Sequence, residues 1–377
     1  MTNLPQFLTL ALERSWLKGS RLAWLFAPVL WPLSKLIWYA LRLHAFARPA
    51  VPLEPLGVPL LVVGNVFVGG VGKTPLVIAL TLHFKSQGLQ VAVISRGYSP
   101  KGTQSSHAPR LVTPLSQAKE VGDEPLMIFE RTGVPVCVGT HRLKAAQHVL
   151  QMHPQLQLII SDDGLQNDTL RPEMTVCVFD DRGTGNGWTL PAGPLREPWP
   201  RIQGVHPSQR APFQWVLNTG EQPKIEGFCA KRRLGHTLID AHGQRCSLKG
   251  LSANSSANSR VHLIALAGVA QPDLFFKMLK DEGLALDECV RLPDHAPLEA
   301  YAPIVQRLKA TYGPQMHLVC TQKDAVKLWR LYPQALAIEL ELSLPSLFLE
   351  ELDRALAQTR QGLLGFSNPT NTAIIEQ

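Results

Sequence analysis

The most informative part of this chain is a glycine-rich run, Gly69-Gly70-Val71-Gly72-Lys73-Thr74, which follows the apolar segment Leu60-Leu61-Val62-Val63. A helix-compatible stretch extends from Thr74 to Phe84, which gives the strand, glycine loop and helix order of a phosphate-binding loop. Glycines allow backbone N–H groups to turn toward phosphate oxygens, and a helix N-terminus favours anions. In such a loop Lys73 would neutralise the β- and γ-phosphates, and the Thr74 hydroxyl would hold Mg²⁺.

The strict loop pattern G-x-x-x-x-G-K-[ST] is broken at its first position, where Phe67 stands in place of Gly. The context still favours a nucleotide loop over an incidental glycine-rich turn. Pro75 lies just inside the helix start, where its missing N–H costs little, and a simple turn would not require Lys and Thr in that order. We therefore expect the nucleotide to contact Phe67, Val68, Gly69, Gly70, Val71, Gly72, Lys73 and Thr74.

Apolar runs of strand length alternate with helix-compatible stretches along the chain. In the first region they cover residues 60–63, 91–95, 134–138, 156–160 and 175–179. This alternation predicts an α/β fold with a mainly parallel sheet that binds ligands at the carboxyl ends of its strands. A second alternating region has expected strands at 261–265 and 317–320, and expected helices at 272–282, 298–311 and 345–357.

Length and composition fit two compact domains behind an N-terminal segment, since 45% of the residues are apolar. A polar zone rich in Gly, Ser and Asn separates the two alternating regions. The predicted organisation is a membrane-associating segment at 1–50, a P-loop domain at 51–220, a polar linker at 221–260, a second, smaller α/β domain at 261–365 and a loose tail at 366–377.

The six cysteines are scattered without C-x-x-C spacing, and several lie in apolar, strand-like runs. They are Cys137, Cys177, Cys229, Cys246, Cys289 and Cys320. Buried free thiols in a cytosolic body are therefore favoured over disulfides or zinc ligands.

Residues 22–41 form an apolar segment with a single charge, Lys35. Twenty helical residues would span roughly 30 Å, the thickness of a bilayer core. Pro28, Pro32 and Lys35 count against a spanning helix, so an interfacial anchor is an equal alternative, and a buried core hairpin is a third. Four indoles recur at intervals of eight, seven and seven residues, as expected at a lipid headgroup level: Trp16, Trp24, Trp31 and Trp38.

The positive charge is concentrated at the N-terminus. Residues 1–50 contain six Lys and Arg against one Glu, so they carry +5 of the formal net charge of +7. A basic segment of this kind favours anionic lipid, whereas a nucleic-acid binder would carry the excess on its folded body. We therefore expect a membrane surface and no nucleic acid as partner.

Polar residues follow the predicted strands, where a parallel sheet presents its chemistry. Asp162 and Asp163 come directly after the run 156–160, an arrangement that places a carboxylate near Mg²⁺ in phosphate-loop enzymes. Adjacent acids after a strand also occur as turn caps, but together with Lys73 and Thr74 they favour a metal site.

Two further clusters offer groups for phosphoryl transfer. Arg96 follows the strand at 91–95, and Asp123 and Glu124 stand between Gly and Pro before a predicted helix. Transfer to a hydroxyl requires a carboxylate that accepts the hydroxyl proton and a cation on the moving group. Asp123 and Arg96 are candidates for these two tasks, although both clusters also fit ordinary loops.

Taken together, these motifs resemble those of the tetraacyldisaccharide 4'-kinases, lipid A pathway enzymes of Gram-negative bacteria. The resemblance covers most of the chain, and the joint order of the motifs is more specific than any one of them. It rests on Gly64-Asn65, Gly69-Gly70-Val71-Gly72-Lys73-Thr74-Pro75, Ser95-Arg96-Gly97-Tyr98, Gly122-Asp123-Glu124-Pro125, Asp162-Asp163-Gly164-Leu165-Gln166, Gly185-Asn186-Gly187-Trp188, Leu190-Pro191-Ala192-Gly193-Pro194-Leu195-Arg196-Glu197, Asp294-His295 and Lys323-Asp324-Ala325-Val326-Lys327.

The resemblance implies a kinase that uses ATP and Mg²⁺ to phosphorylate the 4'-hydroxyl of an acylated glucosamine disaccharide 1-phosphate, giving a lipid IVA-type precursor. It also implies work at the cytoplasmic face of the inner membrane, with no obligate protein partner. By resemblance, Asp123 acts as base together with His295, Lys73 is catalytic, and Thr74, Glu124, Asp162 and Asp163 serve the metal.

Four residues are candidates for contacts with the substrate: Arg96, Arg142, Gln166 and Arg196. Arginine suits a phosphate because its planar fork binds two oxygens at once, but Arg142 and Arg196 also fit as solvated loop cations. The chain departs from the family pattern at Ser99-Pro100, Asn167, Ala270, Ala296 and Gln322.

A membrane-associated P-loop ATPase switch is the alternative from another class. Such switches have a Lys directly before the first loop glycine, where this chain has Val68. A GTPase is a lesser alternative, since Thr321-Gln322-Lys323-Asp324 does not form the guanine-reading Asn-Lys-x-Asp pattern. Hydrolysis without transfer to lipid would favour these switches.

Overall fold

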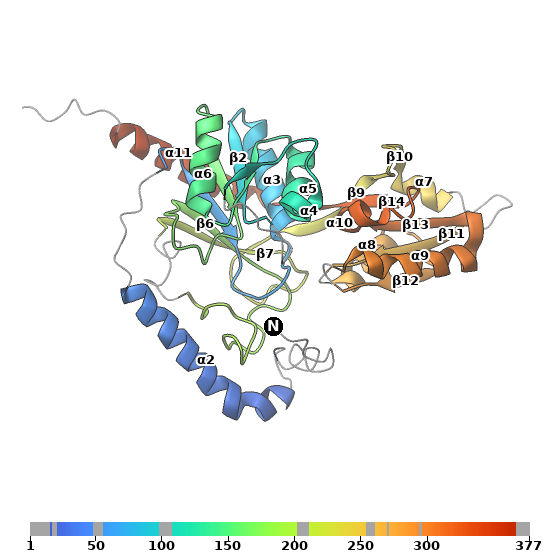
Figure 1. The fold of residues 1–377 in the computed structure, drawn as a ribbon, viewed down its shortest axis with the longest axis horizontal. Helices are drawn as coiled ribbons and strands as arrows, with labels where there is room; N and C mark the ends of the chain where they lie inside the picture. Colours follow the sequence, from blue (N-terminus) through green and yellow to red (C-terminus); the bar gives the residue numbers. More distant parts are fainter. Residues whose placement is uncertain are drawn as a thin grey trace, which may run out of the picture. The chain divides into compact units, whose positions relative to one another are not determined.

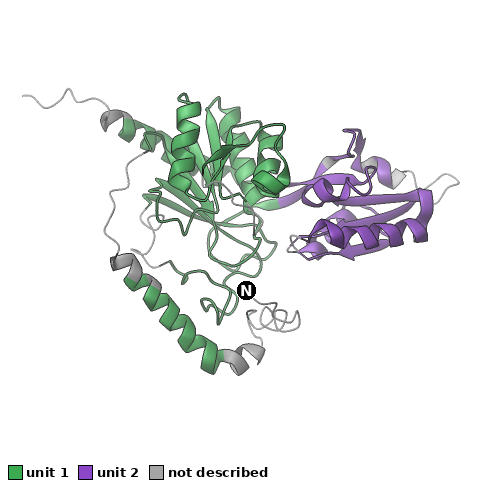
Figure 2. Ribbon diagram, viewed as in Figure 1, with its two compact units in different colours: residues 1–231, 344–377 green, residues 232–343 purple. Residues whose placement is uncertain are grey.

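The computed structural model describes residues 16, 21–47, 56–97, 108–201, 211–253, 261–269, 271–293 and 296–366. The chain divides into two compact units, drawn in two colours in Figure 2. Unit 1 comprises Met1–Lys231 and Leu344–Gln377, and unit 2 comprises Arg232–Ser343. Each unit contains its own sheet with parallel strands, so the expected α/β class is confirmed.

The sheet of unit 1 has the strand order β3-β4-β2-β5-β1-β6-β7-β8 within the described residues. Figure 1 labels its strands β2, β6 and β7. Neighbouring strands are parallel except for β3 and β4, which are antiparallel. The bounds are β1 Leu60–Gly64, β2 Val91–Ser95, β3 Arg110–Leu111, β4 Val136–Val138, β5 Leu158–Asp162, β6 Met174–Phe179, β7 Phe213–Asn218 and β8 Phe228–Cys229.

The central strands β2, β5, β1 and β6 are buried at every residue. A parallel strand covered on both faces needs apolar side chains throughout, which is why these strands are visible in the sequence as continuous apolar runs. Helix α3 packs against β1, β2 and β5 and lies beside α5. The helices of unit 1 are α2 Arg21–Ala47, α3 Lys73–Ser86, α4 Ala118–Val121, α5 Asp123–Thr132, α6 Arg142–Met152 and α11 Ser346–Phe366.

The sheet of unit 2 has the order β10-β9-β14-β13-β11-β12. Its strands β14, β13, β11 and β12 are parallel, and β10 pairs antiparallel with β9. The bounds are β9 Lys231–Ile239, β10 Arg245–Ser247, α7 Leu248–Ala253, β11 His262–Ala267, α8 Pro272–Asp281, β12 Glu288–Arg291, α9 Leu298–Tyr312, the 3₁₀ turn Gly313–Gln315, β13 Met316–Thr321, α10 Gln322–Leu328 and β14 Leu336–Ser343.

The polar zone at 221–260 is not the linker that its composition suggests. It contains β8, β9, β10 and α7, and the last three of these belong almost entirely to unit 2. Strand β9 buries Leu234 and Leu238 but exposes Lys231 and Arg233. Because only one face of the strand is covered, charged residues on the other face interrupt the apolar run by which a strand is recognised in the sequence.

The C-terminal helix α11 also differs from expectation, because it belongs to unit 1 and not to the second domain. Its Phe348 packs against the rings of Trp215 and Phe228. Glu351 accepts a hydrogen bond of 2.8 Å from Trp215 Nε1, and Asp353 lies 2.8 Å from His83 Nε2. The chain therefore returns to unit 1 after completing unit 2. Most of the expected tail, from residue 367 on, lies outside the described residues.

Helix α2 exposes most of its described apolar side chains. Val29, Leu36 and Leu43 are 73%, 67% and 68% exposed, which contradicts the buried core hairpin. Within the described ranges, no helix has both the length and the apolar character needed to span a membrane.

All six cysteines are free thiols, as expected. Cys137, Cys177 and Cys320 are buried, whereas Cys229 is exposed and the other two are half-buried. Burial raises the pKa of Cys137 and of Cys177 to about 12, so neither is a thiolate at neutral pH.

The place of α11 in unit 1 can be tested with two leucines of the same helix. Leu352 is fully buried and Leu347 is 56% exposed. We expect Leu352→Ala to lower the free energy of unfolding by about 2–5 kcal/mol, because it leaves a cavity. Leu347→Ala should change it by less than about 0.5 kcal/mol. Urea unfolding followed by tryptophan fluorescence measures both, and equal effects would contradict this packing.

Candidate active site

The glycine-rich loop connects β1 to α3 at the carboxyl edge of the sheet. Gly69 has φ 100° and Gly72 has φ 87°, both in the left-handed region that residues with a side chain rarely adopt. Gly72 is the N-cap of α3, which begins at Lys73. Thr74 is buried in the first helical turn. Backbone N–H groups at this helix start are therefore available to bind an anion.

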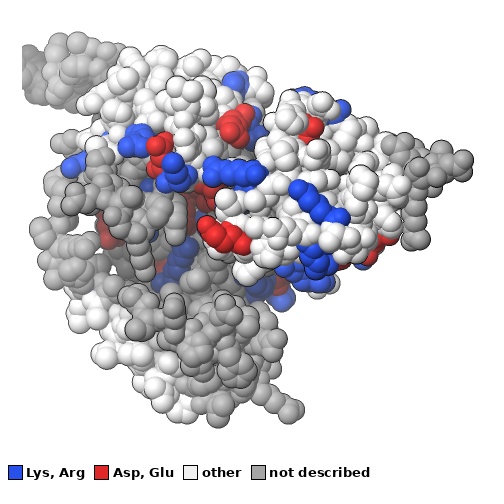
Figure 3. Space-filling view, turned by 45° about the vertical axis from the view of Figure 1, so that its right-hand side comes forward, with Lys and Arg blue, Asp and Glu red and all other residues white. Residues whose placement is uncertain are grey.

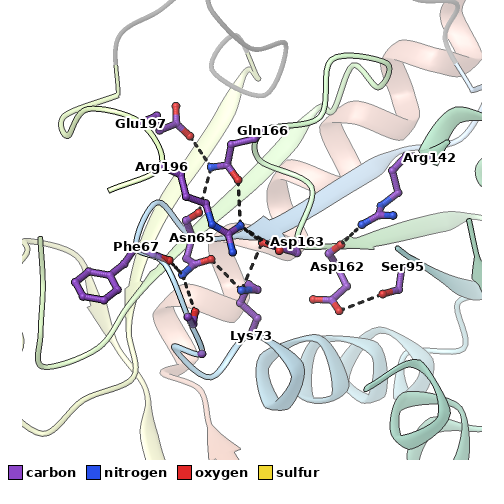
Figure 4. Close-up of polar contacts among 12 residues, drawn as sticks. Asn65, Phe67, Lys73, Ser95, Arg142, Asp162, Asp163, Gln166, Arg196 and Glu197 are labelled. Carbon is purple, nitrogen blue, oxygen red and sulfur yellow. Dashed lines mark hydrogen bonds and ion pairs between the residues drawn. The ribbon is translucent and has the colours of Figure 1, made fainter. Parts of the chain in front are cut away.

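Lys73 is held between a buried amide and a carboxylate, as Figure 4 shows. Its Nζ donates to Asn65 Oδ1 at 2.9 Å and lies 3.4 Å from Asp163 Oδ1. Arg196 Nη1 donates to both oxygens of Asp163, at 3.0 and 3.1 Å. Burial raises the pKa of Asp163, but the two cations outweigh burial and lower it overall, so Asp163 is an anion at neutral pH.

Asn65 shapes the loop around this lysine. Its Nδ2 donates to the backbone carbonyl oxygens of Phe67 and Gly69. The backbone carbonyl oxygen of Asn65 accepts a hydrogen bond of 3.1 Å from Gln166 Nε2. Gln166 Nε2 also donates to Glu197 Oε1 at 2.8 Å (Figure 4). Gln166, a candidate for substrate contact, thus lies in the network that supports the loop.

Asp162 ends β5, next to β1, and is almost completely buried. Ser95 Oγ lies 3.4 Å from its Oδ2, and its Oδ1 has no hydrogen-bond partner among the described residues. Burial, followed by repulsion from Glu124, raises the pKa of Asp162 to about 7, although Lys73 and Arg142 oppose the shift. Burying a carboxylate oxygen without a partner costs free energy, unless a bound cation or a hydrogen-bond donor interacts with it.

The residues at this edge fit Mg²⁺. The ion needs one or two protein carboxylates besides substrate phosphates and water, and Thr74 and Asp162 offer a hydroxyl and an unsatisfied carboxylate oxygen. Over the described ranges, no group of three or more His, Cys, Asp or Glu is placed to bind a metal by itself. Asp163, another predicted ligand, instead contacts Lys73 and Arg196.

Asp123 and Glu124 open α5, directly after Gly122 with φ 97°. Both are half-buried in the first helical turn. Repulsion from Glu124 helps to raise the pKa of Asp162. His295 lies outside the described residues, so its role stays a prediction.

The three predicted arginines have different surroundings. Arg142 is only 4% exposed, and its guanidinium donates to the carbonyl oxygens of Gly139 and Asp162 at 3.0 and 3.2 Å. It therefore stabilises the end of β5 and is not a solvated loop cation. Arg96 is exposed after β2, and Arg196 is half-buried on Asp163.

Sequence reasoning missed Arg182. Its guanidinium stacks over the Phe67 ring at 4.4 Å from the ring centre, and its Nη2 donates to the Gly70 carbonyl at 2.7 Å. Asp180, a buried acid directly after β6, forms an ion pair with the same guanidinium, with 2.7 Å between Asp180 Oδ2 and Arg182 Nη2. An acid directly after an apolar strand was the signal that singled out Asp162, and it would have found Asp180 as well.

A parallel sheet, a glycine loop that leads into a helix, an anchored lysine and a buried acid on the neighbouring strand define a phosphate-loop nucleotide-binding protein. The family model described as Tetraacyldisaccharide-1-P 4'-kinase matches residues 26–357. The chain belongs to this family.

Individual relatives agree with this assignment. The tetraacyldisaccharide 4'-kinase of Polaromonas naphthalenivorans is 41% identical over 338 residues, covering 88% of this chain and 91% of that protein. The enzyme of the same name from Delftia acidovorans is 41% identical, with 91% and 96% covered. A crystal structure of LpxK from Aquifex aeolicus in complex with ATP matches with TM-score 0.65 and 24% identity, over 89% of this chain and 99% of that one. That likeness concerns the fold.

Adjacent acids of the site should respond in opposite directions to the same substitution. Without nucleotide or metal, Asp162→Asn should raise the free energy of unfolding by about 1–3 kcal/mol, because it removes a buried charge that lacks a partner. Asp163→Asn should lower it by up to about 1 kcal/mol, because Lys73 and Arg196 lose a partly exposed anion. Urea unfolding at pH 8 measures both; destabilisation by Asp162→Asn would show that the protein already compensates this charge.

Proposed function

We propose that this protein transfers the γ-phosphoryl group of ATP to the 4'-hydroxyl of a tetraacylated glucosamine disaccharide 1-phosphate, giving a lipid IVA-type precursor in lipid A biosynthesis. The observation that carries the proposal is the anchored Lys73 at the start of α3, in a chain of the tetraacyldisaccharide-1-P 4'-kinase family. Relatives at about 40% identity carry the same enzyme name over nearly their whole length.

The nucleotide in this proposal is ATP, bound along Phe67 to Thr74. Support comes from the positive φ of Gly69 and Gly72, which shapes the loop around an anion, and from the helix start at Lys73. The Aquifex aeolicus structure of the same fold is described as a complex with ATP.

Mg²⁺ is proposed as the metal, with Thr74 and Asp162 as ligands and Glu124 nearby. When bound, it would neutralise charge on the phosphates. Asp163 keeps a supporting role in this proposal, because its oxygens hold Lys73 and Arg196.

In the transfer step the 4'-hydroxyl oxygen forms a bond to the γ-phosphorus, and the bond from that phosphorus to the bridging β-γ oxygen breaks. ADP leaves with the electron pair, and the hydroxyl proton passes to the Asp123 carboxylate. Lys73 offsets the charge that develops on the phosphates. Arg96 and Arg196 are proposed to bind substrate phosphate, and His295 remains a proposed catalytic residue on the strength of the resemblance.

A lipid surface at the cytoplasmic face of the inner membrane is the proposed location. Four acyl chains hold the substrate in the bilayer, at about 0.8 kcal/mol per buried CH₂, so the enzyme has to reach it there. Helix α2 exposes apolar side chains, and residues 1–50 carry most of the net positive charge. Figure 3 shows Lys and Arg interspersed with Asp and Glu on the described face that it draws, so nucleic acid is not proposed as a partner.

The decisive assay supplies labelled ATP, Mg²⁺, detergent and acylated glucosamine disaccharide 1-phosphate, and determines the mass of the lipid product. A gain of one phosphoryl group is the expected result. ATP hydrolysis with unchanged lipid would instead favour the membrane-associated ATPase switch.

The proposed base can be separated from the nucleotide loop by substitution. Asp123→Ala should lower kcat by about 10²–10⁴-fold, because no carboxylate accepts the hydroxyl proton, and should leave ATP affinity nearly unchanged. Lys73→Ala should damage both quantities. Lipid phosphorylation and equilibrium ATP binding provide the two readouts, and Asp281→Ala on α8 serves as a control. Unaltered turnover of Asp123→Ala would remove it as the base.

The lipid-facing role of α2 predicts a change in partitioning. Leu36→Ser and Leu43→Ser should each weaken binding to anionic vesicles by about tenfold, since burying a leucine is worth about 1.5–3 kcal/mol. Thermal stability should not change, because both side chains face solvent. Vesicle cosedimentation measures the binding. Unchanged partitioning would show that this face does not enter the lipid.

A further inference from the structure

Ser34 is an exception on helix α2. Its neighbours Leu33, Leu36 and Ile37 are at least 40% exposed, whereas the Ser34 side chain is almost completely buried. A helix that presents apolar side chains outward and buries a hydroxyl has the reverse of the usual pattern. The buried hydroxyl therefore marks the position at which α2 attaches to the rest of unit 1.

The Ser34 hydroxyl makes contacts far away in the sequence. Its Oγ lies 2.9 Å from the Thr189 carbonyl oxygen and 3.0 Å from the Leu30 carbonyl oxygen, and either oxygen can accept its one hydrogen. The same Oγ accepts a hydrogen bond of 2.9 Å from the backbone N–H of Ala192, which is itself buried. The hydroxyl is thus hydrogen-bonded to Thr189 and to Ala192, on either side of one turn. This turn lies within residues 185–196, which we call the 185–196 loop.

This loop is cross-linked by its own hydrogen bonds. Leu190 N donates to the Leu195 carbonyl at 2.8 Å, and Gly193 N donates to the Thr189 carbonyl at 3.0 Å. Asn186 Nδ2 donates to the Ala192 carbonyl at 3.0 Å. These bonds connect Ala192 and its neighbours to the rest of the loop, including Leu195.

The end of the loop, residues 194–196, is hydrogen-bonded to residues 66–68, where the segment expected to contact the nucleotide begins. Val68 N donates to the Pro194 carbonyl at 2.8 Å, and Arg196 N donates to the Val66 carbonyl at 2.7 Å. Phe67 and Leu195 form an antiparallel bridge between these two bonds. Arg196 then places its guanidinium on Asp163, the anion that also holds Lys73.

A second contact joins the N-terminal residues to the same loop. Asn186 N donates to the Trp16 carbonyl at 2.7 Å, and Trp16 Nε1 lies 3.3 Å from the Pro191 carbonyl oxygen. Two separate points before residue 48 thus bond the 185–196 loop.

We propose that Ser34 is a positioning residue that ties α2 to the 185–196 loop and, through it, sets Val68 and Arg196 for phosphoryl transfer. The inference rests on the proposed function. It gives α2 a second task besides contact with lipid: the helix that meets the membrane also supports the phosphate-binding segment.

The test compares Ser34→Ala with Ser86→Ala. Ser86 is the matched control, because it is exposed at the end of α3 and its hydroxyl donates to the nearby His83 carbonyl, its one hydrogen bond to the described part of the chain. Both full-length proteins are assayed for lipid phosphorylation, for binding to anionic vesicles and for amide hydrogen exchange of the loop.

Ser34→Ala is expected to lower kcat by about 10- to 100-fold while KM for ATP changes less than about threefold, because the reacting groups are misplaced and the glycine loop remains. Amides of residues 188–196 should exchange at least about tenfold faster, since the Ala192 N–H loses its acceptor. Ser86→Ala should match the unsubstituted protein in both measurements, and vesicle binding should be equal in all three.

Normal turnover and normal exchange in Ser34→Ala would overturn the inference. A loss of turnover that is explained by a proportional loss of vesicle binding would overturn it as well, since Ser34 would then serve anchoring alone. If the unsubstituted protein phosphorylates no lipid, the proposed function fails, and the exchange measurement still decides whether Ser34 holds the loop.

Discussion

The site depends on how unit 1 accommodates charge at the carboxyl edge of its sheet. Lys73 is bound at once by the amide of Asn65 and by Asp163, and Asp163 is bound again by Arg196. Each of these residues comes from a different segment: Asn65 follows β1, Lys73 opens α3, Asp163 follows β5 and Arg196 ends a long loop. Such ion pairs contribute little stability at a surface, but here they hold the Lys73 ammonium at the start of α3, where we propose that the phosphates bind.

Asp162 shows the cost of this arrangement. Its carboxylate is buried with one oxygen unsatisfied, and burial together with Glu124 raises its pKa to about 7. Arg142 offsets part of that cost from the protein side, through the backbone oxygen of Asp162 and through its charge. A buried carboxylate of this kind lowers the stability of the protein without a bound ligand. Such a cost is expected of a group that serves binding and not stability.

Strands and site residues were predictable from the sequence to different degrees. The buried strands β1, β2, β5 and β6 lie within two residues of their expected bounds, because a parallel strand covered on both faces consists of apolar residues. Strands β7, β9 and β14 were missed, because each exposes side chains on one face or at an end and so lacks a continuous apolar run. Lys73, Thr74 and Asp162 could be predicted as site residues because strand ends and glycine loops have local signatures. Asp180 carries the same signature as Asp162, an acid directly after an apolar strand, whereas Arg182 and Ser34 have no such local signature.

By itself, the sequence determined the α/β class, the strand, glycine loop and helix around Lys73, and the apolar, basic character of the N-terminal segment, since each depends on residues that are close along the chain. The tertiary structure decided which of the conspicuous residues serve which purpose. It buried Arg142 against the last residue of β5, turned Asp163 toward two cations, brought α11 back to unit 1 and placed Ser34 of α2 against a loop more than 150 residues away. These outcomes depend on contacts between distant segments, and no local pattern encodes which partner a buried polar group will find.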